Sequence, residues 1–353
     1  MLYIIFLTGR CNLKCRYCGG TIPDYVMPRD VRYSIRDLEE FISQDENPSI
    51  AFYGGEPLLR IDLIKRIMDE IDAEHYILQT NGLLLDRLDP DYLKRLSSIL
   101  VSIDGRKEVT DFYRGNGVYD RVLRNVRRIK DFFDGELIAR MTISRKSDVC
   151  TDVKHIISLN IFTHIHWQLD VIWNEKWKGF EKWLHEYNTG ISKLVDMWVS
   201  EIERGNLIKI VPFLGVFKAI LGFKNTSPPC GSGVNSFAIS TDGRVLACPI
   251  CADFEWNVLG NINSDLESLK RVEIIEPCKS CKYLDICGGR CLFFNRERLW
   301  GDQGFRIVCN SVRHLIEKLK SVRDRVLKAI RRGLLDFDEL IYPKFNNTTE
   351  IIP

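Results

Sequence analysis

The residues best suited to chemistry in this chain are its twelve cysteines, which fall into two groups. Three lie within residues 11–18, eight lie within residues 230–309, and Cys150 stands alone. The apolar run Leu2–Leu7 is too short for a secretory signal and has no basic residues before it. A reducing cytosol keeps thiols out of disulfides. We therefore expect a cytoplasmic protein whose cysteines bind metal or do chemistry.

The first group, Cys11, Cys15 and Cys18, has the spacing Cys-x3-Cys-x2-Cys. Three close thiolates suit three irons of a four-iron cluster and leave the fourth iron without a protein ligand. An open iron of this kind can chelate a small molecule. Structural zinc needs four ligands, and no fourth cysteine or histidine lies nearby in the sequence. The spacing therefore favours an open iron–sulfur cluster over zinc.

The second group leaves two metals open by residue type alone. Its members are Cys230, Cys248, Cys251, Cys278, Cys281, Cys287, Cys291 and Cys309. A zinc ribbon made from the two Cys-x2-Cys pairs has an interval longer than the about 15–20 residues usual for such a site, and it leaves four nearby thiols unused. Residue type alone therefore leaves iron–sulfur clusters, a zinc scaffold and a non-catalytic electron relay open.

Short apolar strands alternate with amphipathic helical segments over the first part of the chain. We expect strands at Leu2–Thr8, Ile50–Tyr53, His75–Thr80, Ile99–Asp104, Glu136–Ser144 and Thr163–Asp170, and helices at segments such as Asp37–Ile42, Ile61–Ile71 and Tyr119–Phe133. Repeated strand–helix units predict parallel strands joined by right-handed crossovers. Six units fall short of the eight of a closed barrel. The predicted fold class is therefore α/β, a partial (β/α)6 TIM-like barrel.

Residues after the barrel divide into three further segments. We expect the barrel over residues 1–200, a helical bridge over 201–229, a small cysteine-rich domain over 230–310, and a C-terminal helix and tail over 311–353. The cysteine-rich domain contains a predicted β-hairpin, Phe237–Ser240 with Arg244–Ala247. The apolar spacing in Ser311–Leu335 predicts one helix.

The composition excludes several classes of protein. Of the 353 residues, 45% are hydrophobic and 28% are charged, which indicates a globular chain. Fifty lysines and arginines against 48 aspartates and glutamates give a net charge of +2, so no nucleic-acid partner is expected. No apolar run approaches the roughly 18–20 residues of a membrane-spanning helix, so no membrane partner is expected.

Two motifs of the first part together resemble the radical S-adenosylmethionine (SAM) superfamily. One is the Cys-x3-Cys-x2-Cys spacing after the first strand, with an aromatic residue, Tyr17, before its last cysteine. The other follows the second strand and consists of Gly54, Gly55, Glu56 and Pro57. By this resemblance the glycine-rich motif holds the amino group of the methionine part of SAM. Glycines let the backbone approach a ligand closely, and a glutamate offers a carboxylate to an ammonium.

The second cysteine group resembles the SPASM extension of that superfamily, which carries two auxiliary four-iron clusters. The resemblance implies three 4Fe–4S clusters and SAM as cofactors. It assigns the outer auxiliary cluster to Cys278, Cys281, Cys287 and Cys309. It assigns the inner one to Cys230, Cys248 and Cys291, and Cys251, just after Cys248, is the expected fourth ligand.

The resemblance also implies the reaction. SAM chelates the open iron, and one electron from the cluster cleaves its sulfonium bond to give a 5′-deoxyadenosyl radical, which abstracts hydrogen from a substrate carbon. Residues on the polar faces of the predicted strands are expected around the methionine carboxylate and the ribose. These are Ser102, Arg140 and Gln168, with Gln79 and Asn81 as weaker candidates. An ion pair of Arg140 with Asp104 or Asp170 is the alternative for that guanidinium.

Enzymes that combine these motifs mostly act on peptides or proteins, so a peptide or protein substrate is expected. Sulfatase maturases carry a catalytic aspartate where this chain has Pro249, and Asp253 is the nearby candidate base. An external low-potential donor of flavodoxin or ferredoxin type is expected, and the clusters imply an anaerobic setting. Because the chain starts at the first strand, we expect either that a separate leader-peptide-binding protein recruits the peptide or that the barrel and bridge recognise it directly. The rival substrate is a small cofactor precursor.

Overall fold

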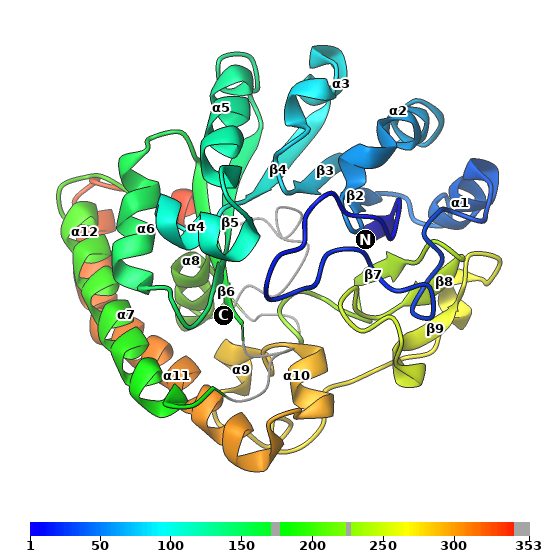
Figure 1. The fold of residues 1–353 in the computed structure, drawn as a ribbon. Coiled ribbons are helices and arrows are strands. Elements are labelled where there is room, and N and C mark those ends of the chain that lie inside the picture. Colours follow the sequence, from blue (N-terminus) through cyan, green and yellow to red (C-terminus); the bar gives the residue numbers. More distant parts are fainter. Residues whose placement is uncertain (171–176, 224–226, 342–353) are drawn as a thin grey trace. The chain divides into compact units, whose positions relative to one another are not determined.

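The computed structural model describes residues 1–170, 177–223 and 227–341 (Figure 1). Its contacts group the chain into two compact units. Unit 1 comprises Met1–Ile103, Thr110–Ile138 and Gly231–Glu273, and unit 2 comprises Asp104–Val109, Ala139–Cys230 and Ile274–Pro353. The four segments expected from the sequence do not follow these units, and their boundaries stay predictions.

Unit 1 contains a sheet built mainly from parallel strands. Its strands are β1 (Leu2–Phe6), β2 (Ser49–Tyr53), β3 (His75–Thr80), β4 (Leu96–Ser102), β7 (Ser236–Ile239), β8 (Arg244–Leu246) and β9 (Val258–Asn261). Within this unit they lie in the order β4-β3-β2-β1-β7-β8-β9. Strands β1 to β4 and β7 run parallel, whereas β8 and β9 are antiparallel. The first barrel strands and the hairpin are thus where the sequence predicts them.

The parallel strands are buried because their sequences are continuous apolar runs. All five residues of β1 are buried, which is typical of strands covered on both faces. Strand β4 differs from its prediction, since it begins at Leu96 and ends at Ser102. It stops before Gly105, whose φ of +108° does not continue a strand.

Helices alternate with the strands of unit 1. They are α1 (Ile35–Ile42), α2 (Ile61–Glu70), α3 (Pro90–Lys94) and α5 (Val118–Lys130), while α4 (Lys107–Arg114) starts in unit 2. Ser34 begins α1 with a capping box shared with Asp37. Figure 1 shows α1, α2 and α3 following one another along the same side of β1 to β4. Single 3-10 turns occupy Pro57–Arg60, Leu85–Arg87, Glu255–Asn257, Leu266–Ser268 and, in unit 2, Phe337–Leu340.

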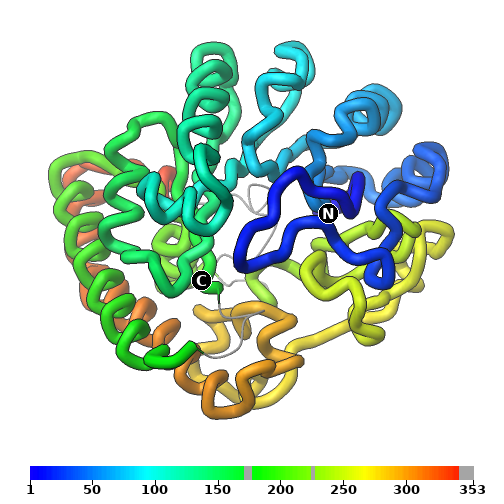
Figure 2. The backbone as a smooth tube through the Cα atoms, viewed as in Figure 1, coloured from blue at the N-terminus to red at the C-terminus, as the bar shows by residue number. Residues whose placement is uncertain are grey.

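The hairpin turn between β7 and β8 is bound to the loop that follows β1. The backbone N–H of Arg32 donates to the Thr241 carbonyl at 2.8 Å, and the Thr241 hydroxyl donates to the Pro28 carbonyl at 2.5 Å. The Arg244 guanidinium donates to the Val26 carbonyl at 2.6 Å. The dark blue loop and the yellow hairpin are therefore neighbours in Figure 2.

Unit 2 carries the last barrel strands and most of the helices. Its elements are β5 (Glu136–Ile143, which starts in unit 1), α6 (Val149–Ser158), β6 (His164–Leu169), α7 (Phe180–Ile202), α8 (Val211–Ile220), α9 (Leu284–Cys287), α10 (Leu292–Glu297), α11 (Gly301–Ser321) and α12 (Arg323–Arg331). Helices α7 and α11 run side by side in Figure 2. Asn188 joins them, because it contacts Ser311 and His314 on α11.

The prediction of one helix over Ser311–Leu335 is wrong at its start and in its continuity. Helix α11 begins ten residues earlier, at Gly301, and ends at Ser321. The N–H of Val322 donates to the carbonyls of Leu319 and Lys320, which tightens the last turn, and α12 begins at Arg323. The apolar spacing continues through this break, so the periodicity alone did not reveal it.

Candidate active site

The loop after β1 presents three cysteines at different depths. Cys15 is buried, Cys11 is half-buried and Cys18 is exposed. The Cys15 carbonyl accepts hydrogen bonds from the N–H groups of Cys18 at 3.2 Å and Gly19 at 2.9 Å, so the loop closes into a tight turn. The N–H of Leu13 donates to the Cys11 sulfur at 3.4 Å. Burial raises the pKa of Cys11, and this hydrogen bond opposes the rise.

Tyr17, the aromatic residue of this loop, packs on the end of α4. Its ring lies 5.5 Å from the ring of Tyr113, and the Arg114 guanidinium lies 5.5 Å from the Tyr17 ring. The N–H of Arg16 donates to the Tyr113 carbonyl at 2.9 Å. These contacts hold the middle of the cysteine loop against a helix.

The Gly54–Gly55 pair brings the end of β2 into backbone contact with the cysteine loop. The N–H of Gly55 donates to the Thr8 carbonyl at 2.9 Å, and the N–H of Glu56 donates to the Arg10 carbonyl at 2.8 Å. A Cβ on Gly54 would lie 2.5 Å from the Thr8 oxygen, and a Cβ on Gly55 would lie 2.3 Å from the Arg10 oxygen. Only glycines fit here, because side chains would push the two segments apart.

The carboxylate of Glu56 is buried and accepts hydrogen bonds from the protein itself. The Leu58 N–H at 3.0 Å and the Thr80 hydroxyl at 2.7 Å donate to Oε1, and the Asn81 N–H at 2.8 Å donates to Oε2. Burial raises the pKa of Glu56 from its usual 4.5 to about 7, although these donors lower it. Glu56 therefore ties the 3-10 turn after β2 to the end of β3.

Asn81 continues this network toward the cysteines. Its Nδ2 donates to Oδ1 of Asn12, which lies between Cys11 and Cys15, at 2.7 Å. Its Oδ1 accepts from the Leu83 N–H at 3.0 Å. From the sequence Asn81 was only a weaker candidate and Thr80 was not singled out, although both lie in the Gln-Thr-Asn-Gly run at the end of β3. Unit 1 thus brings together the three cysteines, Tyr17, the glycine-rich motif and Asn81.

The raised pKa of Glu56 predicts a specific dependence of stability on pH. The folded state holds this proton more tightly than the unfolded state, so the contribution of Glu56 to stability falls as the pH rises from about 4.5 to about 7. Between pH 5.5 and pH 8 the free energy of unfolding of the wild type should fall by about 2 kcal/mol relative to that of Glu56→Gln. Anaerobic urea unfolding measures this difference, and a difference that does not change with pH would contradict the assignment.

The other predicted SAM-binding residues are divided between the two units. Ser102, half-buried, ends β4 in unit 1, and Gln79 is half-buried on β3. In unit 2 the buried Arg140 guanidinium donates to the Gln168 side chain on the adjacent β6 segment. Arg140 on β5 and Gln168 on β6 are therefore hydrogen-bonded to each other across the polar faces of the two strands.

Several polar side chains on the predicted polar faces of β5 and β6 are buried, whereas Thr142 and Gln168 are half-buried. His164, His166 and Arg140 are all at most 7% exposed. The Asp104 carboxylate accepts the Thr142 N–H at 2.9 Å, and the Ser144 hydroxyl donates to Asp170 at 2.7 Å. Polar groups at this depth need such partners, because burial without hydrogen bonds is costly.

Four thiols of unit 2 lie close enough to influence one another. Burial, with the nearby Cys309 and Cys281, raises the pKa of Cys278 to about 11. Burial, with Cys309 and Cys278, raises the pKa of Cys287 to about 12, and the positive charge of Arg290 opposes this. These are the four cysteines that the resemblance assigns to the outer auxiliary cluster, and that assignment stays a prediction. Cys230 and Cys291 belong to the same unit.

Cys248 and Cys251 form a second thiol pair, in unit 1 after β8. Both are buried. A hydrogen bond between the two thiols, together with burial, raises the pKa of Cys248. Asp253, the candidate base, is exposed just beyond them.

All twelve cysteines lie in the described part of the chain, and none of them is in a disulfide. Among the described residues, no three His, Cys, Asp or Glu side chains converge on a point that would hold a single metal ion. Ligands of a four-iron cluster do not need to converge in this way, because each thiolate binds a different iron. Thiols that are neighbours without converging are therefore compatible with cluster ligands.

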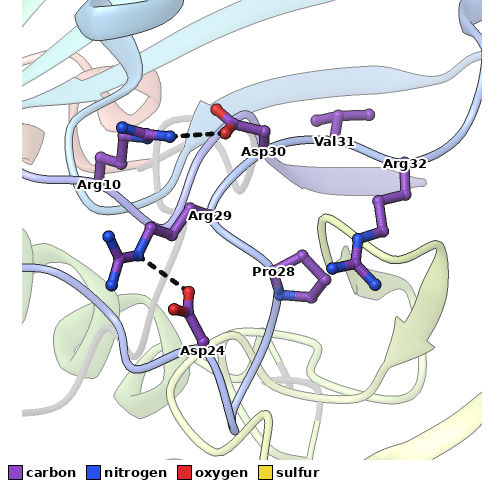
Figure 3. Close-up of a pocket in the computed structure, with 7 residues that line it drawn as sticks. All are labelled: Arg10, Asp24, Pro28, Arg29, Asp30, Val31 and Arg32. Atoms are coloured by element: carbon purple, nitrogen blue, oxygen red, sulfur yellow. Dashed lines mark hydrogen bonds and ion pairs between the residues drawn. The ribbon is translucent and has the colours of Figure 1, made fainter.

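A pocket of about 490 Å³ opens beside the loop that follows the cysteines, and the sequence did not single it out. Figure 3 shows its charged lining, in which Arg10 pairs with Asp30 at 2.8 Å and Arg29 pairs with Asp24 at 2.9 Å. Pro28, Val31 and Arg32 complete it. Five of the lining residues form the continuous run Pro28–Arg32, and Arg10 and Asp24 lie earlier in the sequence, so no spacing rule marks the whole set as neighbours.

Comparison with known proteins identifies the domain that contains this cysteine loop. Residues 5–146 match the Radical SAM superfamily. This part of the chain is a radical SAM domain. A radical SAM domain binds a 4Fe–4S cluster and SAM, and the loop fits both, since it offers three thiols beside a glycine cradle with no room for side chains. In the described residues no helix is long and apolar enough to cross a membrane.

Relatives match this chain beyond the radical SAM domain. A cysteine-type anaerobic sulfatase-maturating enzyme of Clostridium perfringens strain 13 is 26% identical over 346 residues, which cover 87% of this chain and 92% of the relative. The structure of anSMEcpe with bound AdoMet and Cp18Cys peptide superposes with a TM-score of 0.71 at 22% identity, covering 92% of this chain and 99% of that one. Streptococcus suis SuiB bound to precursor peptide SuiA gives 0.54 at 16% identity, with 83% and 72% covered. The predicted partial (β/α)6 barrel fold is confirmed.

Proposed function

We propose that this chain cleaves SAM reductively and uses the resulting radical to abstract hydrogen from a peptide or protein side chain. One observation carries the proposal most directly. The cysteine loop and the glycine-rich motif are joined by the Gly55–Thr8 and Glu56–Arg10 backbone hydrogen bonds, at 2.9 and 2.8 Å. A cluster ligand set and a cradle for an amino acid group are thereby fixed side by side in one unit. The peptide substrate is supported by the extent of the likeness to a sulfatase-maturating enzyme.

The chain's own residues have defined tasks in this proposal. Cys11, Cys15 and Cys18 hold the cluster, which when bound with SAM supplies the one-electron chemistry. Gly54 and Gly55 let the end of β2 lie in backbone contact with the cysteine loop, and this turn is proposed to hold the amino group of SAM. Glu56 positions this cradle by receiving hydrogen bonds from the ends of two neighbouring segments. Ser102, Gln79 and Asn81, with Arg140 and Gln168, are proposed to orient the carboxylate and the ribose.

Two auxiliary clusters complete the proposal. Cys278, Cys281, Cys287 and Cys309 are proposed to hold the outer one, which their mutual effects on pKa support. The inner one is proposed to use Cys230, Cys248, Cys251 and Cys291. The close pairing of the buried Cys248 and Cys251 supports Cys251 as a ligand. A flavodoxin- or ferredoxin-like donor would supply the electron, and a separate protein would present any leader peptide.

The modification itself is proposed to differ from sulfatase maturation. Pro249 follows Cys248, and a proline side chain accepts no proton. Asp253, the replacement candidate, is exposed rather than held in the buried turn. A general base works at hydrogen-bond distance from the proton that it takes, and no hydrogen bond holds the exposed Asp253 carboxylate among the described contacts, which makes it a weak candidate for that task.

The test measures 5′-deoxyadenosine after the reduced, iron-loaded protein is mixed with SAM and candidate peptides encoded beside its gene. A peptide substrate should raise deoxyadenosine at least about tenfold over the peptide-free rate and should itself change in mass. Matched peptides with the target residue replaced serve as controls. Stimulation by a small cofactor precursor and by none of the peptides would contradict the peptide proposal.

A further inference from the structure

Two fully buried asparagines, one in each unit, hold the loops that carry auxiliary cysteines. Asn257 lies at the end of the 3-10 turn Glu255–Asn257, and Asn295 lies in α10. Both are 0% exposed. An asparagine side chain offers one acceptor and two donors, and at this depth each needs a partner. The partners that both residues find are backbone groups at or near cysteines.

Asn257 closes the Cys248–Cys251 turn from the inside. Its Oδ1 accepts the Cys248 N–H at 2.8 Å, while its Nδ2 donates to the carbonyls of Cys248 and Cys251, both at 2.9 Å. Its own carbonyl accepts the Ala247 N–H at 2.8 Å. One side chain therefore satisfies three backbone groups of the two cysteines and fixes the distance between their Cα atoms.

Asn295 does the same for the segment that leads into Cys278. Its Oδ1 accepts the Ile275 N–H at 2.6 Å, and its Nδ2 donates to the Ile275 carbonyl at 3.1 Å. Its backbone N–H donates to the Cys291 carbonyl at 2.9 Å. Asn295 is thus fastened between two cysteine-bearing segments.

We propose that Asn257 and Asn295 are positioning residues, each of which prearranges one set of auxiliary thiols for its cluster. This rests on the proposed function, because it presupposes that the two sets bind clusters. Groups that orient metal ligands from behind affect metal binding nearly as strongly as the ligands themselves. Prearranged thiols lose less conformational freedom when the cluster forms. The hydrogen bonds of both side-chain amides are made within the protein itself, so the two asparagines should hold the cysteine segments in place in the metal-free protein as well.

Asparagine-to-aspartate substitutions test the hydrogen-bonding role, because they change the hydrogen-bonding groups while leaving the size of the side chain almost unchanged. Aspartate keeps an acceptor for the Cys248 or Ile275 N–H, but it replaces the donor by an oxygen that faces carbonyl oxygens. Asn257→Asp and Asn295→Asp should each lower iron and sulfide after anaerobic reconstitution by about four per chain, one cluster's content. Asn263→Asp is the matched control, since Asn263 is exposed in the turn after β9.

A second readout uses the metal-free protein and does not depend on activity. Alkylation of individual cysteines, followed by mass spectrometry, should speed up at least about tenfold at Cys248 and Cys251 in Asn257→Asp, because loosened thiols become accessible. It should speed up at Cys278 in Asn295→Asp. Each variant should leave the other set unchanged. Asn257→Ser and Asn295→Ser, which add no charge, should follow the same pattern.

These results distinguish the positioning role from the cluster assignment. Wild-type iron content together with wild-type alkylation in both aspartate variants overturns the positioning role. Faster alkylation of all cysteines in the aspartate and serine variants also overturns it, because the asparagines would then support the whole fold. If Cys248→Ala and Cys278→Ala retain full iron while alkylation still changes selectively, the cluster assignment fails and the prearranged turns remain.

Discussion

Cys15→Ala is expected to abolish SAM cleavage. Cys15 is the buried member of the three-cysteine loop, and its sulfur is proposed to bind one of the three protein-ligated irons. Alanine keeps the Cys15 carbonyl that accepts the Cys18 and Gly19 N–H groups, so the turn can persist without the thiol. Iron content should fall by about four per chain. Deoxyadenosine formation, measured by chromatography under reducing conditions, should fall at least about a thousandfold.

Cys150→Ala is the matched control for that variant. Cys150 is also buried, but it lies in the first turn of α6 and belongs to neither cysteine group. Its alanine variant should keep wild-type iron content and wild-type cleavage. If Cys15→Ala cleaves SAM as fast as Cys150→Ala, the loop does not hold the catalytic cluster.

Gly55→Ala should damage both folding and SAM cleavage. Its Cβ would lie 2.3 Å from the Arg10 oxygen and 2.8 Å from the Gly9 oxygen, so backbone must move. That movement breaks the hydrogen bond from Glu56 to Arg10, next to Cys11. Overpacking and one lost buried hydrogen bond together cost about 3 kcal/mol of unfolding free energy. The displacement of the cluster loop should slow SAM cleavage at least about a hundredfold.

Gly9→Ala provides the comparison within the same contact. A Cβ on Gly9 would lie no closer than 3.5 Å to any neighbour, which is ordinary van der Waals distance. This variant should lose less than about 1 kcal/mol and keep most of its activity. Denaturant unfolding and a SAM-binding titration compare the two variants. Equal losses in both would show that the close approach of Gly55 to Arg10 is not what the site needs.

Those parts of the fold that depend on local apolar pattern were predictable from the sequence. The run Leu2–Phe6 is buried along its whole length, and such runs identify parallel strands directly. The hairpin could also be placed, because Gly243 takes the positive φ, +84°, that its turn requires. The break between α11 and α12 was not predictable, since the buried Val322 and Val326 continue the same apolar spacing across it.

The candidate ligands of the site were easier to name from the sequence than the residues that support them. Cysteine spacing carries its own chemistry, so the groups of thiols could be named from the sequence. Glu56 was expected to face the ammonium of SAM, and whether it does so is still a prediction. What the structure adds is that Glu56 receives hydrogen bonds from Leu58, Thr80 and Asn81. Such contacts join residues distant in the sequence, and no local pattern records them.

The central claim is that the iron left open by the three N-terminal thiolates binds the amino acid end of SAM. Electron paramagnetic resonance of the reduced, iron-loaded protein with SAM labelled with 17O in its carboxylate and 15N in its amino group tests this directly. The account predicts hyperfine coupling of both labels to a cluster, and loss of that coupling in Cys15→Ala. Tight binding of labelled SAM to the fully loaded wild type without coupling to any cluster would contradict it.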